Sequence, residues 1–129
     1  MFTPHTVDSG SVLPWEYLPA AAGSYEAGQM LKTANGVLST IGAPSATTPA
    51  YLCMGKATVE AGDLIPVTRV SRDVIYETTL GGDADGKGVG DKLQVGAGGL
   101  FASADAEGTF EVTYLEGAAK GAVVRGRFL

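Results

Sequence analysis

The chain has 129 residues, of which 45% are hydrophobic, so we expect one folded domain with room for one core but not two. Its formal net charge of −5 repels phosphate backbones, and its nine Lys and Arg residues are scattered, so we expect no nucleic-acid binding. The 19 glycines and six prolines argue against a helical protein and favour short strands joined by tight turns.

Residues 1–23 differ from the rest of the chain. They hold the only Trp, the only His and three of the six prolines, and they lack both helical and strand periodicity. Because proline pushes the preceding residue toward extended conformations, we predict an extended N-terminal arm followed by a single domain at residues 24–129. Residues 12–13 and 15–18 are too apolar for a solvated tail. We expect them to pack either on their own domain or on a neighbouring subunit or partner.

The first clear hairpin lies at Asn35-Gly36. This pair separates the apolar runs at residues 29–34 and 37–41. Asn-Gly is the strongest short hairpin signal, because a type I′ turn needs a positive φ at both central residues.

Residues 51–80 form the most strand-like stretch of the chain. Two strands are expected to turn over at residues 60–63, where Gly62 supplies the free backbone and Asp63 can bond the turn amides. A third strand begins near Val74, where apolar and polar residues alternate with a period of two. Pro66 lies within the second strand, which predicts an edge strand or a bulge there.

The C-terminal third continues in the same style. Residues 81–91 read as a flexible surface loop. A short hairpin is expected from residues 92–95 and 100–103, then a strand at 109–116 in which Phe110, Val112 and Tyr114 share one face, and a last strand at 122–129. Together these elements predict an all-β fold, a small barrel or sandwich of successive hairpins.

Motifs that carry chemistry are weak in this chain. His5 lies near the N-terminus, and Cys53, amid apolar residues, is expected to be a small buried hydrophobe, which suits a reducing compartment or a particle assembled inside one. Residues 83–94 resemble a calcium loop, but Lys87 occupies a ligand position and Gln94 stands where a bidentate Glu is needed. We therefore expect no catalytic residue, no metal site and no cofactor. No signal peptide and no apolar run long enough to span a membrane are expected.

Four segments in this order resemble a known family. They read G-x-x-L-K-T-A-N-G-V-L at residues 28–38, Y-L-C-M-G-K-A at 51–57, V-E-A-G-D-L-I-P-V-T-R-V at 59–70, and G-D-K-L-Q-V at 90–95 followed by G-G-L at 98–100. The order of hairpins and turn glycines is similar to the small head-decoration, or capsid-cement, proteins of tailed bacteriophages and prophages. The resemblance covers residues 23–129.

The resemblance implies a function without catalysis. Members of this family form compact β-barrels or β-tulips, usually trimers, that sit on the outside of the capsid, so the implied partners are the major capsid protein and two further copies of this chain. Such a particle is assembled in the bacterial cytoplasm. The family's N-terminal arm contacts the shell, and the arm residues expected to make this contact are Phe2, Val12, Leu13, Trp15, Tyr17 and Leu18. The alternative is a β-sandwich binding module for carbohydrate or a receptor on a phage particle.

Overall fold

The computed structural model describes all residues from 1 to 129 and consists of strands, turns and loops without a helix, so the all-β prediction is confirmed. The strands are β1 (Thr3–Val7), β2 (Glu16–Pro19), β3 (Gly23–Tyr25), β4 (Met30–Ala34), β5 (Val37–Thr40), β6 (Tyr51–Cys53), β7 (Ala57–Val59), β8 (Leu64–Arg69), β9 (Val74–Thr79), β10 (Lys92–Val95), β11 (Ala102–Ser103), β12 (Phe110–Leu115) and β13 (Val123–Phe128).

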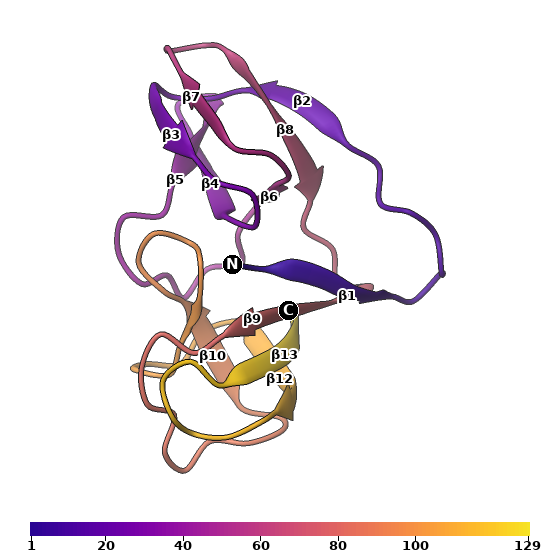
Figure 1. Cartoon of the computed structure of the whole chain (residues 1–129), viewed down its shortest axis with the longest axis vertical. Helices are drawn as coiled ribbons and strands as arrows, with labels where there is room; N and C mark the ends of the chain where they lie inside the picture. The colour runs from indigo at the N-terminus through magenta and orange to yellow at the C-terminus, as the bar shows by residue number, and fades with distance from the viewer.

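The strands divide into two lobes, one above the other in Figure 1. The first lobe contains a five-stranded sheet of order β2-β8-β6-β4-β5 and the small β3-β7 pair. The second lobe contains a six-stranded sheet of order β1-β9-β13-β12-β10-β11. All pairings within these sheets are antiparallel, which suits a chain built from short strands and tight turns.

Each sheet curls until strands from its two sides meet at a single bridge. In the first lobe Ala20 bridges Leu38, and the Ala21 N–H donates to the Leu38 carbonyl at 2.8 Å. In the second lobe Leu80 bridges Ala102, and the Gly81 N–H donates to the Ala102 carbonyl at 2.9 Å. This curling encloses apolar side chains on the concave side of each sheet, as in a small barrel.

The buried side chains form two hydrophobic clusters, whereas the sequence predicts one core. The larger cluster has 16 buried residues and lies mainly inside the second lobe, and the smaller has seven and lies inside the first. Adjacent residues of β4 show how the two are separated, because Met30 joins the larger cluster and Leu31 the smaller. Successive strand side chains point to opposite faces, so one short strand serves both clusters.

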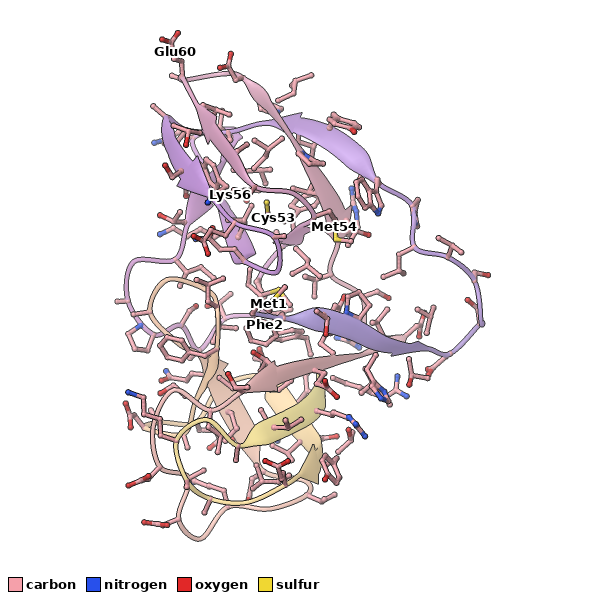
Figure 2. The ribbon with its side chains drawn as sticks, in the orientation of Figure 1. Met1, Phe2, Cys53, Met54, Lys56 and Glu60 are labelled. Atoms are coloured by element: carbon pink, nitrogen blue, oxygen red, sulfur yellow. The ribbon has the colours of Figure 1, made fainter.

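Residues 1–23 do not form a separate arm. Strand β1 pairs with β9 in the second lobe, and β2 pairs with β8 in the first. Figure 2 shows Met1 and Phe2 between the lobes, below Cys53 and Met54, and Phe2 is only 1% exposed. Of the apolar residues for which two alternatives were open, Leu13 and Leu18 pack partly on their own chain, whereas Val12, Trp15 and Tyr17 are exposed, so the first alternative holds for only part of the segment.

The predicted turns are in place. Asn35 and Gly36 have φ values of 53° and 81°, and β4 and β5 pair across them as a two-residue hairpin. At the next turn, the Asp63 carboxylate accepts a hydrogen bond from the Glu60 N–H at 3.0 Å. The strands on either side of this turn do not pair with each other, however, because β7 pairs with β3 while β8 lies between β2 and β6.

Two local predictions are wrong. Pro66 lies in the central strand β8, not in an edge strand or a bulge. The strand tolerates this proline because the backbone N and O of Pro66 face the end of β6, where the ladder stops. The Pro66 carbonyl accepts a hydrogen bond there from the Met54 N–H at 2.9 Å. Tyr114 does not share the buried face of Phe110 and Val112. The register shifts between Val112 and Tyr114, and this bulge turns Tyr114 outward, 42% exposed.

Candidate protein-contact surface

The outward face of the β2-β8 pair is apolar. Tyr17 lies opposite Pro66 and Pro19 opposite Leu64, so these four side chains share one face, and we call them the β2-β8 face. Tyr17 is 62% exposed and Leu64 59%, whereas the intervening Ile65 is completely buried. A solvent-facing strand pair normally carries polar residues at such positions, so this face is the clearest candidate for contact with another protein.

The structure divides the six predicted contact residues into three groups. Val12, Trp15 and Tyr17 are exposed. Leu13 packs partly against the larger cluster and Leu18 against the smaller. Phe2 is a core residue with its ring against Phe110 and Phe128, so it is not accessible to a partner and its prediction as a contact is wrong.

Leu64 belongs to the face, but no pattern in the sequence distinguishes it as a contact residue. It stands in the run Leu64-Ile65-Pro66-Val67, in which every residue is apolar and no alternation distinguishes the inner from the outer face. Only the pairing of β8 with β2 assigns Leu64 and Pro66 to the outside.

The connection between β1 and β2, residues 8–15, is fixed at both ends. At its start, the Asp8 carboxylate accepts two hydrogen bonds from the Arg127 guanidinium, at 2.8 and 2.9 Å. This pairing holds the pKa of Asp8 below its usual value and raises the pKa of Arg127. At its end, the buried Thr68 hydroxyl donates to the Pro14 carbonyl at 2.9 Å. The connection therefore presents Val12 and Trp15 from a defined position.

A groove of about 430 Å³ lies between this connection and the end of β8. It is lined by Leu13, Pro14, Glu16, Thr68, Arg69 and Ser71. The Arg69 guanidinium stands 5.5 Å from the centre of the Tyr51 ring and donates to the Tyr51 hydroxyl at 3.2 Å. These contacts fix the charge of Arg69 beside the groove.

The residues considered for chemistry lie in separate environments. His5 is exposed on β1 and shares a hydrogen bond with the neighbouring Thr6 hydroxyl at 2.8 Å. Cys53 is fully buried in the smaller cluster, and its thiol donates to the Gly55 carbonyl at 3.1 Å. Burial raises the pKa of the Cys53 thiol, which disfavours the reactive thiolate. No group of three or more His, Cys, Asp or Glu side chains is arranged to hold a metal ion.

Comparison of the chain with known protein families, with curated proteins and with solved structures gives no match. The structure contains no helix that is long and apolar enough to cross a membrane.

Proposed function

We propose that this chain is a structural virion protein that decorates the outside of a tailed-phage head, binds the major capsid protein as a homotrimer and stabilises the shell. The family resemblance of residues 23–129 suggests this role. The all-β fold agrees with the expected architecture. In this proposal the protein is not an enzyme, and it joins the particle in the bacterial cytoplasm.

The observation that carries the proposal is the exposed β2-β8 face together with Trp15. Trp15 is 53% exposed and stands two residues before Tyr17, which lies opposite Pro66 and next to the Pro19-Leu64 pair. Tyr and Trp dominate the energetic centres of protein interfaces, because they bury a large area at a small cost in conformational entropy. A coat-protein surface that covers this face would remove their apolar area from water.

Trimerisation would multiply the effect of each contact. Three identical faces on one trimer bind the shell as a multivalent unit, which strengthens attachment roughly 10²- to 10⁴-fold over a single contact without any new interaction. Each face then needs only modest affinity of its own.

Light scattering after size-exclusion chromatography tests the trimer, and co-sedimentation with shells of the major capsid protein from the same phage tests attachment. We expect the double variant Trp15→Ser/Leu64→Ser to fold normally and to bind the shells at least tenfold more weakly, since buried aromatic anchors are worth about 2 kcal/mol or more. The control is Val89→Ser, which removes a still more exposed apolar side chain (74% exposed) from the second lobe. Equal binding by both variants would remove the β2-β8 face from the proposal.

A binding module for carbohydrate or a receptor on a phage particle is the second candidate. The exposed pair Trp15 and Tyr17 favours it, because aromatic rings stack on the apolar faces of sugars. A glycan array separates the two functions. Specific glycan binding that is lost in Trp15→Ala, by a monomer that ignores capsid shells, would favour the module.

A further inference from the structure

Strand β1 forms one end of the six-stranded sheet and β2 one end of the five-stranded sheet, but their outer edges differ. The edge of β1 is closed to further pairing. Pro4 has no N–H to donate, the register shifts between Pro4 and Thr6, and the Val7 carbonyl already accepts the Gly10 N–H at 2.8 Å. These are the usual devices that protect an edge strand.

The edge of β2 is open at Tyr17. The Ala20 N–H donates to the Asp63 carbonyl at 3.0 Å, so Ala20 faces the β8 side. Because backbone groups alternate sides along a strand, Leu18 also faces β8, whereas Tyr17 faces away from it. The partner strand agrees, since Pro66 opposite Tyr17 turns its carbonyl to the Met54 N–H of the β6 side.

Strand β5 lies close to β2 on this side but forms no ladder of paired residues with it. Beyond Pro19, the contact with β5 consists of the Ala20-Leu38 bridge and the hydrogen bond from Ala21 to Leu38. The Tyr17 N–H and C=O therefore point outward beside an apolar face. The exposed surface of the β3-β7 pair, by contrast, is polar. There the Ser24 and Thr58 hydroxyls share a hydrogen bond of 3.1 Å.

We propose that the open edge of β2 accepts an extended segment of the coat protein as an added strand. The inference rests on the proposed function and specifies its contact. The Tyr17 N–H would donate to a carbonyl of that segment and the Tyr17 carbonyl would accept an N–H from it, with apolar side chains of the segment beside Tyr17 and Leu64. Pro19, which has no N–H, limits the added ladder to a short stretch and so protects the free protein from pairing with itself.

Substitution of the backbone donor tests the inference. Tyr17→Pro removes the outward N–H and the side chain, while Tyr17→Ala removes the side chain alone. Neither change touches the hydrogen bonds between β2 and β8, because residue 17 faces away from β8, and Glu16 before it is already extended. Both variants are expected to unfold at similar temperatures. Tyr17→Pro should bind capsid shells about tenfold more weakly than Tyr17→Ala. The proline variant loses one backbone hydrogen bond, and its ring obstructs the hydrogen bond next to it.

Hydrogen exchange on the wild-type protein gives a second readout that needs no variant. The Tyr17 amide should exchange rapidly in the free protein and become protected on the shell. Equal affinities of the two variants, together with an unprotected Tyr17 amide, would overturn strand addition while leaving side-chain docking intact. Failure of the wild-type protein to bind shells at all would instead refute the proposed function.

Discussion

The ring of Phe2 stands edge-on against the ring of Phe110, with 5.7 Å between the ring centres and an angle of 89° between the planes. The backbone N–H of the same residue donates to the Gly28 carbonyl of the first lobe at 2.7 Å. One residue at the N-terminus thus joins the aromatic core of the second lobe to a turn of the first. The N-terminal segment is a structural element of both lobes and not a free arm.

Phe2→Ala is expected to lower the free energy of unfolding by about 3–5 kcal/mol, because it leaves a cavity among the aromatic rings of Phe110 and Phe128. Chemical denaturation monitored by tryptophan fluorescence measures the change. Val12→Ala is the control and should be neutral, since Val12 is 92% exposed. For the same reason, deletion of residues 1–18 should unfold the chain. A folded deletion variant would contradict this account of Phe2.

The ion pair between Asp8 and Arg127 predicts a pH-dependent contribution to stability. The hydrogen bonds from the Arg127 guanidinium lower the pKa of Asp8 from its ordinary value of 3.8, so the folded state favours the ionised carboxylate. The contribution is therefore complete above pH 3.8 and is lost as the pH falls through the lower pKa of the folded state.

Thermal unfolding of wild type and Asp8→Asn checks this prediction. The wild type should melt at the higher temperature at pH 7, and the difference should shrink as the pH falls below the ordinary pKa. Because the pair is exposed, added salt should also reduce the difference. A difference that stays constant with pH would show that Asp8 acts through something other than its charge.

Gly126→Ala should destabilise the chain. A Cβ at this position would meet the Glu111 carbonyl of the neighbouring strand and stand 3.0 Å from the Phe110 ring. A backbone carbonyl in a ladder cannot move aside, so we expect a loss of about 1–3 kcal/mol from overpacking. Gly42→Ala is the matched control, because its Cβ would meet nothing within 4 Å. Equal unfolding free energies for the two variants would contradict the close approach of β12 and β13.

Cys53 should react with iodoacetamide only when the chain opens. Its side chain has no exposed area, and burial raises the pKa of its thiol. Mass spectrometry should show slow alkylation of the native protein and rapid alkylation in urea. Phe2→Ala should accelerate the native reaction by the same factor as it raises the unfolding equilibrium constant. Rapid alkylation of the native wild type would show that the smaller cluster opens locally.

Features that depend on neighbouring residues were predictable from the sequence. The Asn35-Gly36 hairpin and the alternation that begins at Val74 are determined by positive φ angles and by side chains two residues apart. From such signals the all-β class and most strands of the C-terminal third follow. Trp15 and Tyr17 were singled out in the same way, as residues that a solvated tail does not need, and their role in contacts stays a prediction.

Only the tertiary structure decided how these strands are combined. The pairing of β2 with β8 places Tyr17 beside Leu64 and puts Pro66 inside a sheet, and the entry of Phe2 between the lobes removes it from the surface. These arrangements join segments far apart in the sequence, and several local patterns are compatible with each. The favoured arrangement is the one that removes the most apolar surface from water in the whole chain. The sequence alone does not show which side of a strand another strand will cover.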